Sequence, residues 1–157
     1  MPNTTVHIIR DVLLAYPKLY KAQANQFGAV QFDTRVDFPV ARMAELSQFS
    51  RQTPRACDVA ENMLSINIRL PEKNRNDKLN SIKVIDMKGE LLNPTEVMEM
   101  GNGTRANLKV LRYQSPKDGK FSTQLREVQV IEYKKYELDS IDFDIVDNKP
   151  TNTSVDF

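Results

Sequence analysis

The chain has 157 residues, of which 40% are hydrophobic and 27% are charged, and this composition is typical of a folded domain with an appendage. Its formal net charge of +1 hides an uneven distribution, because residues 1–136 carry +6 and residues 137–157 carry −5. The single Cys57 excludes an intrachain disulfide, and the single His7 leaves no Cys/His set for a zinc site. No apolar run reaches the length that spans a bilayer.

The first part of the chain predicts two strands and a helix. Residues 5–14 form an apolar run of strand length, and a Tyr-Pro step at 16–20 follows it. Residues 29–38 alternate with period two, which places one set of side chains on a common face: Val30, Phe32, Thr34, Val36 and Phe38. Pro39 then opens a helical pattern whose apolar stripe is formed by Val40, Met43 and Ala44 and, less regularly, by Leu46 and Phe49.

The second part predicts further strands separated by polar loops. Residues 63–70 alternate again, residues 71–80 predict a mobile basic loop, and residues 81–92 predict a hairpin that turns at Lys88-Gly89. Asn93 and Pro94 predict the start of one short helix or turn. Three features complete this part: a strand with Ala106, Leu108 and Val110 on one face, a basic turn at 115–120, and a strand at 121–136 with a β-bulge between Leu125 and Val128.

These elements favour a mainly β fold. Five or six strands, one central helix and long polar loops, without βαβ alternation, predict a small barrel of the oligonucleotide-binding (OB) type, and a β-sandwich stays open as the alternative. We expect residues 1–136 to form this domain. Residues 137–157 are rich in Asp, Asn and Thr and predict a flexible, disordered acidic tail.

The basic body carries the ingredients of a site for single-stranded nucleic acid, in which aromatic rings stack on bases and cations contact phosphates. Aromatic and basic residues are interleaved in several short segments, and Lys109 and Tyr113, on the face opposite Ala106, Leu108 and Val110, are the best individual candidates. The candidate DNA-binding residues are Tyr16, Lys18, Tyr20, Lys21, Arg35, Lys73, Arg75, Lys78, Arg105, Asn107, Lys109, Arg112, Tyr113, Lys117, Lys120, Lys134 and Lys135. Each Tyr-Lys neighbourhood also has a structural interpretation, in which the ring packs at a barrel edge beside a solvated charge.

Catalysis finds little support in the sequence. There is no P-loop and no dinucleotide-binding glycine motif, and a nucleophilic site would depend on His7, which lies in a strand-like apolar run. We therefore expect a protein that is not an enzyme and that uses no cofactor and no metal.

The acidic tail ends on an aromatic side chain, which a purely solubilising segment does not need. Its carboxylates can occupy the basic groove in place of phosphates, and its terminal Phe and carboxylate can dock in a partner's pocket. The residues assigned to these roles are Asp142, Phe143, Asp144, Asp156 and Phe157.

In order along the chain, several segments resemble those of phage-encoded single-stranded DNA-binding proteins with an OB fold and an acidic tail ending in Phe. They are YPKLYKAQ, AVQFDTRVDFP with its helix, IKVIDMKGELLNPTEV, EMGNGTRANLKVLRY, SPKDGK, LREVQVIEY and the terminal Val-Asp-Phe. The resemblance implies sequence-independent binding of single-stranded DNA and recruitment of replication or recombination proteins, such as a DNA polymerase or helicase, through the tail.

The sequence thus predicts a protein that coats single-stranded DNA during phage replication or recombination in the cytoplasm of a bacterial host, with no membrane role. The N-terminal segment lacks the pattern of a secretory signal peptide, which agrees with that location. Self-association stays open, and two other functions do too: an RNA-binding OB module, and a non-catalytic structural or adaptor protein.

Overall fold

A computed structural model of the chain describes residues 4–57 and 61–136. The predicted tail, with Asp142, Phe143, Asp144, Asp156 and Phe157, lies outside the described residues. The elements follow one another in the order β1 (Thr5–Ala24), β2 (Val30–Pro39), η1 (Val40–Arg42), α1 (Met43–Leu46), η2 (Ser47–Phe49), β3 (Arg55–Ala56), β4 (Met63–Pro71), β5 (Lys83–Ile85), α2 (Pro94–Met98), β6 (Thr104–Gln114) and β7 (Phe121–Glu132).

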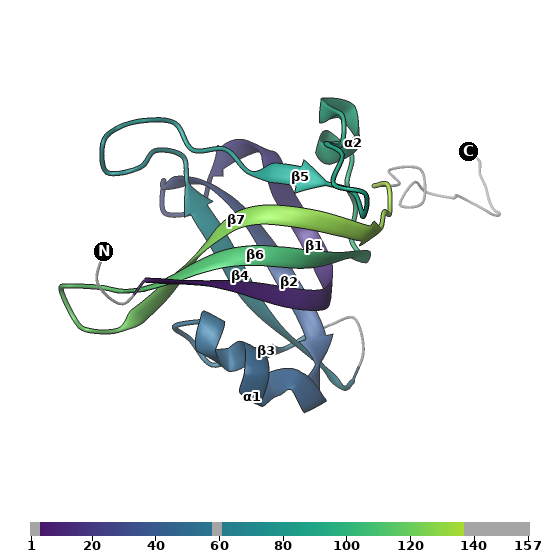
Figure 1. The fold of residues 1–157 in the computed structure, drawn as a ribbon. Helices are drawn as coiled ribbons and strands as arrows, with labels where there is room; N and C mark the ends of the chain where they lie inside the picture. The colour runs from purple at the N-terminus through teal and green to yellow at the C-terminus, as the bar shows by residue number, and fades with distance from the viewer. Residues whose placement is uncertain (1–3, 58–60, 137–157) are drawn as a thin grey trace, which may run out of the picture.

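Five of the strands close into a barrel, which confirms the predicted OB-type fold. The strand order is β4-β2-β1-β6-β7, and a parallel contact between Arg69 of β4 and Gln124 of β7 closes the circle. All other neighbours in the barrel are antiparallel. The short strands β3 and β5 extend the sheet beside β4 and β7, and α1 and α2 lie on opposite sides of the barrel (Figure 1).

The strands form where the sequence alternates, because every second side chain enters the barrel and leaves water. On β2 the predicted inner face is buried from Phe32 to Phe38, whereas Val30 at the strand's start is 40% exposed. On β6 the predicted inner residues Ala106, Leu108 and Val110 are fully buried. The hydrophobic face of each strand is therefore the strongest determinant of the fold.

Strand β1 is longer than the apolar run at 5–14 suggests, because it continues through the Tyr-Pro step to Ala24. Its first half pairs with β6 and its second half with β2, and Leu13 and Leu14 pair with both neighbours. Register shifts around Tyr16 and between Lys18 and Gln23 bend the strand around the barrel.

The helical segment after β2 buries a different face from the predicted one. Val40, Met43 and Ala44 are exposed, whereas Leu46 and Phe49 are buried in the core. The segment is not one α-helix but a 3₁₀ turn, four α-helical residues and a second 3₁₀ turn. A 3₁₀ turn has three residues per turn instead of 3.6, so the stripe expected from an α-helical period does not form.

The remaining predictions concern turns and the last strand. The Asp86–Gly89 turn, with Gly89 at φ +85°, confirms the turn at Lys88-Gly89, although its second arm is a single bridge from Leu91 to Ile85. Arg126 is the extra residue of the bulge predicted between Leu125 and Val128. Strand β7 ends at Glu132, four residues before the predicted end.

Candidate nucleic-acid interface

The outward side chains of β1, β2 and β4 form one continuous surface, which we name the β1–β2–β4 face. Because Phe32, Thr34 and Val36 point into the barrel, Gln31, Asp33 and Arg35 point away from it. The register places residues side by side in two rows: the buried Ala15 with Arg35 and Asn67, and next to them Lys18, Asp33 and Arg69.

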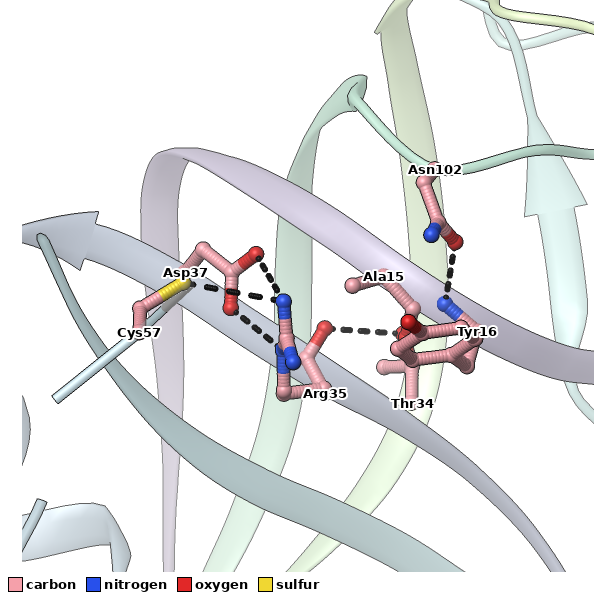
Figure 2. A network of polar contacts seen from close by, with 7 residues as sticks. All are labelled: Ala15, Tyr16, Thr34, Arg35, Asp37, Cys57 and Asn102. Carbon is pink, nitrogen blue, oxygen red and sulfur yellow. Dashed lines mark hydrogen bonds and ion pairs between the residues drawn. The ribbon is translucent and has the colours of Figure 1, made fainter. Parts of the chain in front are cut away.

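At the centre of this face an arginine is fixed beside an aromatic ring. The Arg35 guanidinium lies 5.3 Å from the centroid of the Tyr16 ring and donates to both carboxylate oxygens of Asp37, at 2.9 and 3.1 Å (Figure 2). It also donates to Sγ of Cys57 at 3.6 Å. Asp37 is only 2% exposed, so its carboxylate holds the guanidinium in place from beneath while the Tyr16 ring stays 57% exposed.

Tyr16 adopts an unusual backbone conformation, with φ at +49°. Left-handed backbone is unfavourable for a bulky residue and is kept only where the surroundings hold it. Asn102 supplies that contact, because its Oδ1 accepts a hydrogen bond from the Tyr16 N–H at 2.7 Å (Figure 2). The exposed ring is thus presented by a strained turn within β1.

The loop that carries Asn102 is held on both sides by its glycines. The Gly101 N–H donates to the carbonyl of Lys134 at 2.7 Å, and a Cβ on Gly101 would lie 2.8 Å from the backbone of Tyr136. The Gly103 N–H donates to the carbonyl of Leu14 at 2.8 Å, close to Tyr16 in β1. These glycines let the loop approach β1 closely enough for Asn102 to reach the Tyr16 N–H.

Further cations lie on the same face, and another exposed aromatic lies in the loop at the end of β1. Within residues 4–57 and 61–136, Lys18 and Arg69 have no carboxylate within ion-pair distance. Phe27, in the loop between β1 and β2, is 84% exposed. Oδ1 of Asn25 shapes that loop by accepting hydrogen bonds from the N–H groups of Phe27 and Ala29. Sequence reasoning missed Arg69, Asn67 and Phe27; the alternation at 63–70 marks the first two as outward, and an aromatic before Gly28 in a turn marks the third.

The predicted basic loop lies at the same end of the barrel as the β1–β2 loop. The Glu72 N–H donates to the carbonyl of Val30 at 3.1 Å, which ties the start of the loop to the start of β2. Three of the predicted cations lie on this loop, and two further predicted residues lie on the exposed bulge of β1 nearby: Lys73, Arg75 and Lys78, and Tyr20 and Lys21. Lys73 is 3.6 Å from Asp77 within the loop.

The predicted residues on β6 lie beyond β1, on a different part of the barrel. Arg105 pairs with Asp11 at 2.6 Å, and Lys109 pairs with Glu127 at 3.3 Å. The Asn107 side chain accepts the Asp11 N–H and donates to Gln129. These three side chains thus have partners on β1 and β7, and none of them contacts Tyr16 or Arg35 among the described interactions.

Some of the predicted residues at the two ends of the β6–β7 pair have partners as well. Arg112 lies 3.9 Å over the Phe121 ring and donates to the carbonyl of Gln48, and Tyr113 is half-buried. Lys117 and Lys120 are exposed on the hairpin turn, whose Asp118 is 3.2 Å from Arg51. A backbone hydrogen bond from Lys120 is the main cause that lowers the pKa of the Asp118 carboxyl. Beyond β7, Lys134 pairs with Glu132 and Lys135 with Glu99.

Neither a metal site nor a membrane-spanning helix is found in the described part of the chain. No group of three or more His, Cys, Asp or Glu side chains is arranged to hold an ion there. No helix of that part is long and apolar enough to cross a membrane.

Comparisons with known proteins identify solved structures with a similar fold. No family model and no curated protein matches the chain in sequence. Among solved structures, the single-stranded DNA-binding protein of bacteriophage Enc34 in complex with ssDNA is similar, with a TM-score of 0.54, 18% identity, and coverage of 83% of this chain and 88% of that chain. The structure of gp2.5, a single-stranded DNA binding protein encoded by bacteriophage T7, gives a TM-score of 0.60 and 12% identity over 95% of this chain and 99% of that one. At such identities the likeness establishes a shared fold.

Proposed function

We propose that this chain is a sequence-independent single-stranded DNA-binding protein and that the strand lies across the β1–β2–β4 face. The observation that carries the proposal is the exposed Tyr16 ring held beside the Arg35 guanidinium on adjacent strands. In OB folds the second and third barrel strands and the adjoining loops bind oligonucleotides, and β2 and β4 occupy those places here. A protein of similar fold has been solved in complex with ssDNA, which supports the same assignment.

The chemistry of this face suits a strand without base pairing. A base can stack on Tyr16, which contributes about 1–3 kcal/mol per stacked base and tolerates any sequence, since every base has a π-face. Lys18 and Arg69 contact phosphates and release counterions, so the affinity falls as salt rises. Arg35 is already occupied by Asp37 and serves mainly to fix the ring and to extend a cation toward the strand.

The remaining candidates divide into an extension of this face and a separate set. Tyr20, Lys21, Lys73, Arg75 and Lys78 extend the face along the strand's path, with Phe27 as a further stacking platform. The residues of β6, its hairpin and the segment after β7 would contribute to a longer path around the barrel: Arg105, Asn107, Lys109, Arg112, Tyr113, Lys117, Lys120, Lys134 and Lys135.

Such a protein would protect single strands during phage replication or recombination, in the cytoplasm of a bacterial host, without catalysis. The domain would comprise residues 1–136. Residues 137–157, with a formal charge of −5, would compete with DNA for the basic face and recruit a replication protein such as a polymerase or helicase.

A salt-dependent titration of fluorescent oligo-dT tests the proposal. We expect binding at low salt, a strong preference for single strands over duplex, and a log–log salt slope that becomes about 0.7 less steep for Arg69→Ala. Lys88→Ala, an exposed cation on the Asp86–Gly89 turn, is the matched control and leaves the slope unchanged. No binding to oligo-dT at low salt, or equal affinity for duplex, would refute the proposal, and tighter binding of a matched RNA oligomer would favour an RNA-binding module.

Removal of residues 137–157 tests the tail separately. Because the tail would compete with phosphates, its deletion should tighten oligo-dT binding. Unchanged or weaker binding after the deletion would contradict competition while leaving DNA binding by the β1–β2–β4 face intact.

A further inference from the structure

An apolar cleft lies between the turn after β5, helix α2 and the end of β7, where these elements meet at one side of the barrel (Figure 1). Its volume is about 360 Å³. Two large apolar side chains that line it are well exposed: Met87 at 57% and Leu91 at 68%. Ile131 and Tyr133 of the chain at the end of β7 line its floor. So much exposed apolar surface in one place is typical of a docking site.

The walls of this cleft are held in fixed positions. Oδ1 of Asp86 accepts hydrogen bonds from the N–H groups of Lys88 and Glu90, at 2.8 and 3.0 Å. These bonds shape the turn that carries Met87 and leads to Leu91. Asn93 and Glu96 form a reciprocal capping box at the start of α2. The Tyr133 hydroxyl donates to the carbonyl of Glu96 at 2.7 Å and so fastens α2 to the end of β7.

The rim of the cleft is acidic, in contrast to the rest of the body. Residues 86–99 hold four carboxylates and one lysine, a formal −3, whereas the other residues of 1–136 together carry +9. The carboxylates are Asp86, Glu90, Glu96 and Glu99; Asp86 and Glu96 line the cleft, and Glu99 pairs with Lys135. Burial, followed by the charges of Glu96 and Glu99, raises the pKa of the Tyr133 hydroxyl. A nucleic acid or an anionic lipid surface would be repelled here, so charge complementarity selects a cationic occupant.

We infer that this cleft is a docking surface for a partner protein, whose bound segment places an apolar side chain between lysines or arginines. The apolar side chain would enter between Leu91 and Ile131, and the cations would face Asp86 and Glu96. Met87 in the lining suits such a site, because an unbranched thioether side chain adapts to different apolar shapes. The surface is formed by β5, α2 and β7 and shares no residue with the β1–β2–β4 face, so a partner can bind while DNA is bound.

The inference is tested on the full chain with a short fluorescent peptide of alternating Leu and Lys. Two control peptides carry Ser in place of Leu, or Glu in place of Lys. We expect only the Leu-Lys peptide to bind well, and Leu91→Ser to weaken it about tenfold, since one buried aliphatic contact is lost. Met87→Ser serves as a second variant in case Leu91→Ser does not fold. Because residues 137–157 are present in every variant, their attraction for the peptide is constant.

Val6→Ser is the matched control, since Val6 is 57% exposed on the outer side of β1, outside this cleft. It should leave peptide binding unchanged, and the amide NMR shifts caused by the peptide should centre on residues 86–99 and 131–133. Equal binding by wild type, Leu91→Ser and Met87→Ser, or shifts centred on another face, overturns the inference. Self-association that depends on Leu91 also overturns it, because a second copy would then cover the cleft.

Discussion

Replacing Asn102 by alanine should weaken DNA binding through Tyr16 alone. The side chain of Asn102 makes one hydrogen bond to the Tyr16 N–H, at 2.7 Å, and Tyr16 has a φ of +49°. A left-handed conformation costs a non-glycine residue about 1–2 kcal/mol, and one hydrogen bond contributes about 1 kcal/mol against it. Loss of this hydrogen bond shifts the equilibrium between the observed ring position and other positions of the ring by about fivefold. The Kd for oligo-dT should therefore rise by up to about fivefold.

A double-mutant cycle isolates this effect. Tyr16→Ala removes the stacked ring and should cost about 1–3 kcal/mol of binding, and Asn102→Ala should cause no further loss in that background. Asn93→Ala is the matched control, because its Oδ1 also accepts one backbone N–H, from Glu96 at 2.8 Å. That change should lower the free energy of unfolding by about 1 kcal/mol without moving the DNA affinity.

The assay is fluorescence anisotropy of labelled oligo-dT, with urea unfolding of each variant in parallel. If Asn102→Ala weakens binding by the same factor with and without Tyr16, Asn102 does not act through the ring, and the reasoning fails. An equal loss from Asn93→Ala would mean that general destabilisation explains the effect.

Two further predictions concern the core and the charged face. Leu46→Ala should lower the free energy of unfolding by about 2–5 kcal/mol, since Leu46 is fully buried. Met43→Ala, at a 40% exposed position, should change it by less than about 0.5 kcal/mol. Equal effects of the two substitutions in urea unfolding would contradict the observed helix face. Arg35→Ala should destabilise the fold more than Arg69→Ala, because it leaves the Asp37 carboxylate buried without its guanidinium. Equal unfolding midpoints of the two variants would contradict this role of Arg35.

Much of the barrel could be predicted from the sequence because hydrophobic burial acts residue by residue along a strand. Alternation at 29–38, 63–70 and around 106–110 marks the inner faces, and the break in phase near Arg126 marks the bulge. These patterns depend on the period of the strand alone, so they need no knowledge of its neighbours.

Features that depend on neighbouring strands could not be predicted in the same way. The continuation of β1 through Pro17 depends on its pairing with β2, and the closure of the barrel depends on one contact between Arg69 and Gln124. The helix face was wrong because 3₁₀ turns on either side of α1 rotate Leu46 and Phe49 inward. An α-helical period assumed across the whole segment cannot locate such a change.

The candidate site shows the same division. Tyr16 and Arg35 stand nineteen positions apart, and only the register of β1 against β2 brings the guanidinium to the ring. Arg69 was missed because its strand shows no aromatic neighbour, although its outward phase is evident at 63–70. The assignment of these residues to DNA binding stays a prediction until the titrations above are made.

Pairing, rather than the number of cations, should decide which basic residues contribute most to binding a phosphate backbone. Lys109, one of the best individual candidates in the sequence, lies 3.3 Å from Glu127, and Arg105 lies 2.6 Å from Asp11. A paired cation must give up its carboxylate before it neutralises a phosphate, so it releases fewer counterions than a free one. Arg69 and Lys18 have no such partner among the described residues and lie on the same face as the exposed Tyr16 ring beside Arg35. We therefore expect Arg69 and Lys18 on the β1–β2–β4 face, where bases can also stack, to contribute more to phosphate binding than the paired cations of β6.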